Sequence, residues 1–114
     1  RGRANRDAGR FGDAIADFTR GLELDPMLTL AFYYRGRVHR SLDQFEEAVA
    51  DFTTSLDLDP GLAVAYYYRG RSHQSLGQNL EAISDYRAVL QITDEETLVE
   101  VANAQLATLG VAAG

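Results

Sequence analysis

Two short segments rich in arginine and tyrosine carry side chains that could recognise a charged ligand. Tyr-Tyr-Arg-Gly-Arg occurs at residues 33–37 and again at residues 67–71. Guanidinium groups beside aromatic rings suit carboxylate recognition, because arginine forms two parallel hydrogen bonds to a carboxylate and also stacks on ring faces. The only two histidines, His39 and His73, each follow one of these segments by two residues. These side chains are therefore the first candidates for a binding or catalytic site.

The spacing of the two histidines does not favour metal binding or catalysis. They lie 34 residues apart, and equivalent helices of a repeated fold pack about 8–10 Å apart. Zinc ligands, in contrast, lie ~2 Å from a shared metal. The chain has no cysteine, and no nucleophile with an orienting partner accompanies the histidines. We expect both histidines to pack inside the fold, and we expect no enzyme activity, metal or cofactor.

The period of 34 residues organises most of the chain. Each period contains two amphipathic helical patterns separated by a short break. The helices of the second and third periods are expected at residues 29–42, 45–58, 63–76 and 79–92. Turn-favouring residues mark the breaks between the two helices of each period: Gly9, Asp43-Gln44 and Gly77-Gln78. Pro26 and Pro60 end the second helix of the first two periods, because proline disfavours helix at the preceding residue.

The residues that recur in each period resemble a known helical repeat. In the second helix a small residue precedes an aromatic one by four positions, as in Ala14 and Phe18, Ala48 and Phe52, and Ala82 and Tyr86. Gly36 and Gly70 recur in the first helix, and Pro60 follows a second helix. Over residues 1 to about 96 this pattern resembles the tetratricopeptide repeat (TPR) family. The resemblance implies an all-α solenoid, an α-α superhelix whose first helices line a concave groove and whose second helices form the convex back.

We expect one domain over residues 1–114, built of units at about 1–28, 29–62 and 63–96. After the third unit, Thr93-Asp94-Glu95-Glu96 is a capping-box pattern that starts a further helix at 94–109. The sequence leaves open whether this helix is a cap or the first helix of a truncated fourth unit. Since residue 1 is not methionine and the first unit starts midway through a helix, we expect a piece of a longer protein.

Charges divide unevenly between the two helices of each unit. The net charge is −6, which opposes nonspecific binding to nucleic acid, and all eleven basic residues are arginine. The first helices hold eight arginines against Asp7, and the second helices hold eleven acids against Arg20 and Arg87. An acidic protein is therefore predicted to have a basic groove.

One arginine of each first helix is predicted to form a structural ion pair. It lies beside the recurring glycine and faces an aspartate of the second helix. The three pairs are Arg1 with Asp17, Arg35 with Asp51 and Arg69 with Asp85. We expect these arginines to stabilise the unit rather than to bind a ligand.

The remaining arginines and tyrosines form a stripe that we assign to the groove. The predicted peptide-binding residues are Arg3, Arg6, Tyr33, Tyr34, Arg37, Arg40, Tyr67, Tyr68, Arg71 and Gln74. They favour an extended or helical, acidic segment of a partner protein. Related co-chaperone domains grip a C-terminal carboxylate at positions that hold Arg3, Tyr34, Val64 and Tyr68 here. We therefore expect a partner other than a heat-shock chaperone tail.

Two other functions remain open at this stage. The array could be a structural spacer or self-association scaffold in a larger protein. It could also bind single-stranded nucleic acid through tyrosine stacking and arginine contacts, although the net charge opposes this. No apolar run approaches the ~20 residues that cross a bilayer, so we expect no membrane partner. The sequence does not identify the compartment, and a cytoplasmic location is favoured.

Overall fold

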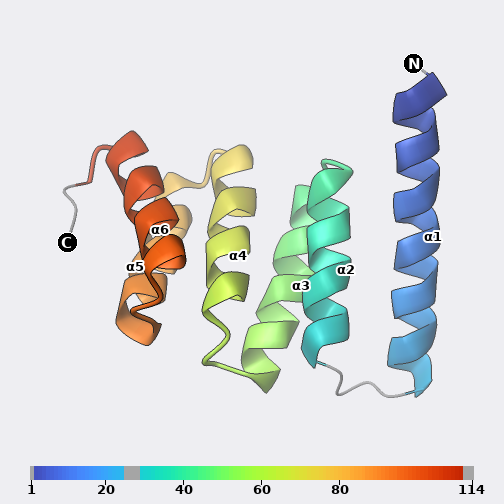
Figure 1. Ribbon diagram of the computed structural model, residues 1–114, viewed down its shortest axis with the longest axis horizontal. Helices are drawn as coiled ribbons and strands as arrows, with labels where there is room; N and C mark the ends of the chain where they lie inside the picture. Colours follow the sequence, from blue (N-terminus) through green and yellow to red (C-terminus); the bar gives the residue numbers. More distant parts are fainter. Residues whose placement is uncertain (1, 25–28, 112–114) are drawn as a thin grey trace.

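The computed structural model describes residues 2–24 and 29–111, with side chains from residue 13 onward. The described residues form six α-helices and no strand (Figure 1). The helices are α1 (Gly2–Leu24), α2 (Thr29–Ser41), α3 (Phe45–Leu58), α4 (Ala63–Ser75), α5 (Asn79–Ile92) and α6 (Glu96–Thr108). The predicted all-α class is confirmed, and α2 to α5 have the expected bounds to within one residue.

The helices follow one another along the long axis of the molecule and form a solenoid (Figure 1). Helix α2 packs on α3 and α4 packs on α5, which gives two helical hairpins. Helix α1 packs on the first hairpin and α6 on the second. In the described residues each helix contacts only the next one or two helices along the chain, as in other repeat arrays, so stability is approximately a sum of local contributions.

Glycine brings the two helices of each hairpin into close contact. A Cβ atom built on Gly36 would lie 2.8 Å from the Phe52 ring, and one built on Gly70 would lie 2.8 Å from the Tyr86 ring. Phe52 and Tyr86 are fully buried. The predicted role of the recurring glycine at this contact is confirmed, because any larger side chain would push the aromatic ring away.

The turn inside each hairpin depends on a pair of polar residues as well as on backbone conformation. Asp43 and Gly77 have φ angles of 60° and 76°. The Gln44 N–H donates to the His39 carbonyl at 2.8 Å, and the His39 ring contacts Gln44 Oε1 at 2.6 Å. The second hairpin repeats both contacts, with His73 and Gln78 at the same distances.

The expected break at Gly9 does not form, because α1 is one continuous helix through that position. The turn residues of the other units explain the difference. Asn5 and Arg10 stand one period before His39 and Gln44, so the side-chain pair that closes the turn cannot form. Ala8 also replaces Leu42, and alanine favours helix. A glycine alone therefore does not end this helix.

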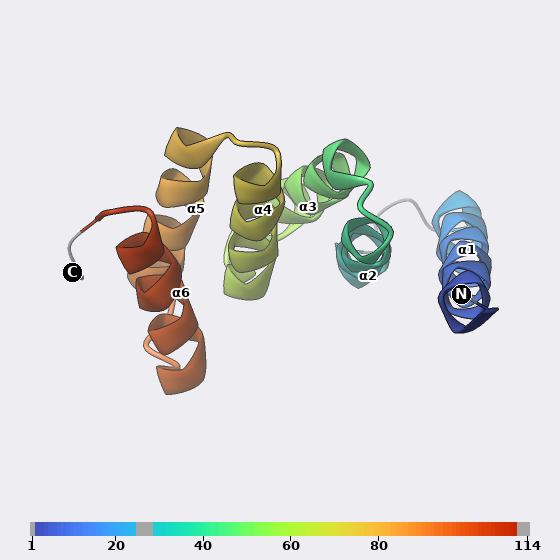
Figure 2. The ribbon, with the colours of Figure 1, turned by 90° about the horizontal axis from the view of Figure 1, so that it is seen from above.

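The first helices of successive units lie on the inner side of the curve. Helix α2 contacts α4 and α4 contacts α6, whereas α3 and α5 do not approach each other within contact distance in the described chain. Figure 2 shows α3 and α5 displaced to the other side of the row formed by α2, α4 and α6. Helices on the inside of a curve are closer together than those on the outside, so the resemblance placed the two layers correctly.

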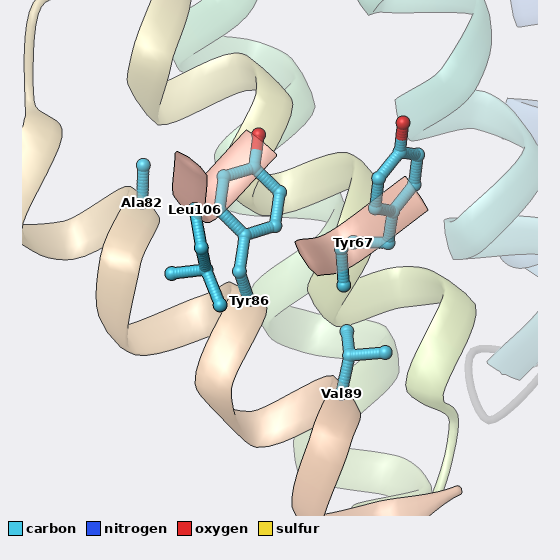
Figure 3. Packing of buried hydrophobic residues seen from close by; sticks show 6 residues of the cluster. Tyr67, Ala82, Tyr86, Val89 and Leu106 are labelled. Carbon is cyan, nitrogen blue, oxygen red and sulfur yellow. The ribbon is translucent and has the colours of Figure 1, made fainter. Parts of the chain in front are cut away.

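Helix α6 covers the end of the second hairpin. Its buried residues Ala102 and Leu106 join a core cluster with Tyr86 and Val89, shown in Figure 3. The helix begins two residues later than the capping-box pattern implied, at Glu96 instead of residue 94: the Glu95 side chain accepts hydrogen bonds from the N–H groups of Thr97 and Leu98. Helix α6 therefore packs as the first helix of a unit does.

None of the six described helices is long and apolar enough to cross a bilayer.

Candidate functional site

The arginines beside the recurring glycines form the predicted ion pairs. Arg35 donates to both carboxylate oxygens of Asp51, through Nε and Nη2, at 2.7 Å each. Arg69 donates to Asp85 in the same way at 2.9 and 2.7 Å. Two of the three predicted pairs are confirmed, while Arg1 of the third pair lies outside the described residues.

Each paired arginine also reaches the preceding unit. Arg35 Nη1 donates to Thr19 Oγ1 on α1, and Arg69 Nη1 donates to Thr53 Oγ1 on α3, both at 3.2 Å. The hydrogen bonds to Asp51 raise the pKa of Arg35. Burial alone would lower the pKa of Arg69, but hydrogen bonding to Asp85 and its charge raise it overall. Both guanidinium groups are therefore fully committed to the fold.

The two histidines support the same ion pairs. His39 Nε2 lies 3.7 Å from Asp51 Oδ2, and His73 Nε2 lies 3.7 Å from Asp85 Oδ2. The other ring nitrogen of each histidine contacts the glutamine of the turn. Both rings are thus used inside their own units, as the sequence predicted.

Three other arginines project from the inner helices and have no carboxylate partner. They are Arg37 and Arg40 of α2 and Arg71 of α4. None lies within ion-pair distance of an acid among the side chains of residues 13–24 and 29–111. The Arg37 and Arg40 guanidinium carbons lie 4.8 and 5.1 Å from the centre of the same ring, that of Tyr68. We call Arg37, Arg40 and Arg71 the arginine cluster.

Two buried tyrosine rings pack against the arginine cluster. Tyr33 and Tyr67 are only 5% and 8% exposed. Arg71 Nη1 donates to the Tyr67 hydroxyl at 3.1 Å. The sequence grouped Tyr33 and Tyr67 with the exposed stripe, yet the structure shows them supporting the arginines from below.

The two other predicted tyrosines are more accessible. Tyr34 is 43% exposed and stacks on Phe18 of α1, with ring centroids 6.1 Å apart. Tyr68 is half-buried and stacks on Phe52 at 6.3 Å. Tyr34 and Tyr68, at the edge of the predicted stripe, therefore expose more aromatic surface than Tyr33 and Tyr67 at its centre.

A hydrogen bond below the cluster involves a residue that the sequence interpretation missed. The Tyr86 hydroxyl donates to Gln74 Oε1 at 2.7 Å. Burial raises the pKa of Tyr86 well above its usual range, against the opposing charges of Arg71 and Arg40. Phe52 and Arg40 stand at the equivalent positions one period earlier. Both positions change together between the two units, from Arg40 and Phe52 to Gln74 and Tyr86. This paired change is the feature of the sequence that could have indicated the hydrogen bond.

A small pocket lies next to Tyr68, between α4 and α6. Its volume is about 300 Å³, and its lining residues are Val64, Tyr67, Tyr68, Glu95, Thr97, Leu98 and Val101. The sequence did not predict it, because it requires α6 to lie against α4. Of the other predicted residues, Arg3 and Arg6 are in α1, where their side chains lie outside the described part.

Comparison with known families agrees with this architecture. The tetratricopeptide repeat family matches twice, at residues 1–63 and 33–96. The chain therefore belongs to the tetratricopeptide repeat family, whose members are commonly protein–protein interaction modules. A search of curated protein sequences returned no match.

Several solved structures are similar to this chain. The first TPR of Spaghetti (RPAP3), bound to the HSP90 peptide SRMEEVD, has a TM-score of 0.82 and 25% identity, covering 96% of this chain and 84% of that one. The second TPR of Spaghetti, bound to the same peptide, has a TM-score of 0.72 and 30% identity, covering 82% and 86%. The Arabidopsis OM64 TPR domain, at 24% identity and a TM-score of 0.80, covers 94% and 88% and supports the fold alone.

Proposed function

We propose that this chain is a peptide-binding module that holds an acidic segment of a partner protein against the inner faces of α2 and α4, without catalysing a reaction. The observation that carries the proposal is the contrast in pairing among the arginines. Arg35 and Arg69 each have a bidentate carboxylate partner, whereas the arginine cluster has none in the described chain. Unpaired guanidinium groups on aromatic rings favour a ligand that brings its own carboxylates.

The position of the cluster supports the same conclusion. Arg37 is exposed on α2, one of the inner helices, with Tyr68 beside it, and the exposed Tyr34 adds aromatic surface on the same helix. Tyrosine and arginine are enriched at binding hot spots because they give large contact area and directed hydrogen bonds. The acidic residues of α3 and α5 lie on the other layer, where they would repel an acidic ligand from the back.

Relatives give independent support for a peptide ligand. Both Spaghetti domains were solved with the HSP90 peptide SRMEEVD, in which two glutamates are adjacent. Tyr34, Val64 and Tyr68 occupy clamp positions in this chain, so we still predict that the HSP90 tail itself binds weakly. Titration with SRMEEVD would test this prediction, and a dissociation constant in the low micromolar range would contradict it.

Peptide arrays that differ only in charge would test the proposal. The expected result is retention of peptides rich in glutamate and aspartate over peptides in which lysine replaces each acid. Reversing two groove charges, in Arg37→Glu with Arg71→Glu, should reduce binding at least tenfold. Arg87→Glu on α5 is the matched control, since Arg87 is exposed on the other layer.

Two outcomes would overturn the proposal. Equal retention of acidic and basic peptides would remove the argument from charge. Unchanged binding in the double variant, together with a changed oligomeric mass in light scattering, would instead indicate a self-association element.

A further inference from the structure

We propose that the acidic group read by the arginine cluster is a phosphorylated side chain rather than a lone carboxylate. This inference rests on the proposed function and specifies its ligand. The cluster gathers three positive charges, and the groups around it can donate further hydrogen bonds.

The positive charge of the cluster exceeds what one carboxylate can neutralise. Arg37 and Arg40 both lie about 5 Å from the centre of the Tyr68 ring, which keeps them within the ~8–10 Å over which charges still interact at physiological salt. The Arg71 guanidinium carbon lies 6.0 Å from the centre of the Tyr67 ring, and the Tyr67 and Tyr68 ring centroids are 5.2 Å apart. One carboxylate would neutralise a third of this charge, whereas a phosphate monoester carries about −1.5 to −2 at neutral pH.

The polar groups around the cluster keep free hydrogen-bond donors. Gln74 Oε1 already accepts from Tyr86, so the amide NH₂ of Gln74 remains free to donate. The Tyr67 oxygen accepts from Arg71, so its own O–H can donate. In Figure 3 the hydroxyl groups of Tyr67 and Tyr86 point to the same side.

Arg40 Nε is buried and has no hydrogen-bond partner among the described residues. A buried N–H without an acceptor is destabilising. A ligand that supplies an acceptor, and toward which the Arg40 side chain turns, would remove that cost. A phosphoryl group has three acceptor oxygens, and it can serve Arg40 while also accepting from Arg37 or Arg71.

Three degenerate peptide libraries would test the inference by fluorescence anisotropy. Their flanking positions share one mixture of residues, and their centres carry phosphoserine, serine or Glu-Glu. The expected result is binding of the phosphoserine library at least tenfold tighter than serine and at least fivefold tighter than Glu-Glu.

Two variants separate phosphate recognition from general charge attraction. Arg40→Lys keeps the charge but removes the Nε–H and the planar guanidinium group, and it should abolish the preference for phosphoserine over Glu-Glu. Gln74→Glu replaces the free amide donor by a carboxylate that Tyr86 can still bond, and it should have the same effect. Arg87→Lys and Gln91→Glu on α5 are the matched controls and should retain the preference. Circular dichroism would establish that all four variants fold.

The outcomes distinguish this inference from the proposed function. Equal binding of the Glu-Glu and phosphoserine libraries would overturn the phosphate inference and leave the acidic-peptide function intact. No preference for either acidic library over serine would overturn both. A phosphoserine preference that survives Arg40→Lys and Gln74→Glu would show that phosphate binds elsewhere.

Discussion

The same two helices, α2 and α4, present arginine on two faces with opposite consequences. On the face toward α3 and α5, Arg35 and Arg69 are fixed by carboxylates and by the preceding unit. On the inner face, Arg37 and Arg71 lie over tyrosine rings, Arg71 donates to the Tyr67 hydroxyl, and neither has a carboxylate partner in the described chain. Arg35 and Arg37 are two residues apart, which turns their side chains about 200° around the helix axis. This rotation therefore separates a structural arginine from a candidate for ligand binding.

The comparison shows that the residue type alone does not assign a function here. The role of each arginine depends on which side chains the neighbouring helix places opposite it. Substitutions on the packed face should therefore alter stability, and substitutions on the inner face should alter binding with little effect on folding.

The largest effect on stability is expected from Asp51→Ala. It would leave the Arg35 guanidinium, whose side chain is 21% exposed, without its carboxylate. Loss of one partner of a largely buried ion pair should lower the free energy of unfolding by about 3 kcal/mol. Urea denaturation would measure it, with exposed Asp57→Ala as a control expected to change stability by less than about 0.5 kcal/mol. Equal effects of the two variants would contradict the assigned role of Arg35.

A second substitution on the packed face should lower the free energy of unfolding by somewhat less. Gly36→Ala places a methyl group 2.8 Å from the Phe52 ring, and such overpacking should lower the free energy of unfolding by about 2 kcal/mol. Gly21→Ala in α1 would place its methyl group more than 4 Å from every described neighbour outside its own helix backbone. It should stabilise the helix by up to about 1 kcal/mol. Thermal melting would compare the two, and a stabilising Gly36→Ala would show that the helices can separate easily.

Tyr86, which lies next to the arginine cluster, should make a smaller contribution to stability that depends on pH. Burial raises the folded-state pKa of Tyr86, so the unfolded chain releases this proton first, and stability should fall as pH rises above about 10. Tyr86→Phe should cost about 1 kcal/mol at pH 7 through the lost hydrogen bond to Gln74. It should also reduce the loss of stability between pH 9 and 11, as measured by denaturation at each pH. The pKa of Tyr33 is raised in the same direction, mainly by burial, so part of the alkaline loss should remain.

The smallest effect on stability is expected on the inner face. Arg37→Ala removes an exposed side chain with no carboxylate partner in the described part of the chain. Its free energy of unfolding should change by less than about 0.5 kcal/mol, as measured by urea denaturation. A loss above 1 kcal/mol would place Arg37 with the structural arginines and weaken the comparison.

The sequence predicted the packed face well because its contacts repeat with the period. Arg35 and Asp51 are 16 residues apart, and so are Arg69 and Asp85, within one hairpin. A contact inside a single supersecondary unit depends only on local geometry, and its recurrence confirms the register. The contact between Gly36 and Phe52 was predictable for the same reason.

The inner face was less predictable because it depends on neighbouring units. Tyr33 and Tyr34 are adjacent in the sequence, and only the positions of α1 and α4 decide which ring is buried. Arg40 is partly buried by Tyr68, which comes from the next unit along the chain. The missing break at Gly9 shows a related limit, because Asn5 and Arg10 replace the histidine and glutamine that contact each other across the other two turns.

The threonine contacts of Arg35 and Arg69 have a consequence for the order in which the array opens. These contacts tie α2 to α1 and α4 to α3, but the junction with α6 has different residues. Asn103 stands one period after Arg69, and its buried Oδ1 has no partner in the described chain. Amide hydrogens of α6 should therefore exchange with deuterium before those of α4, so that the array frays from its carboxyl-terminal end.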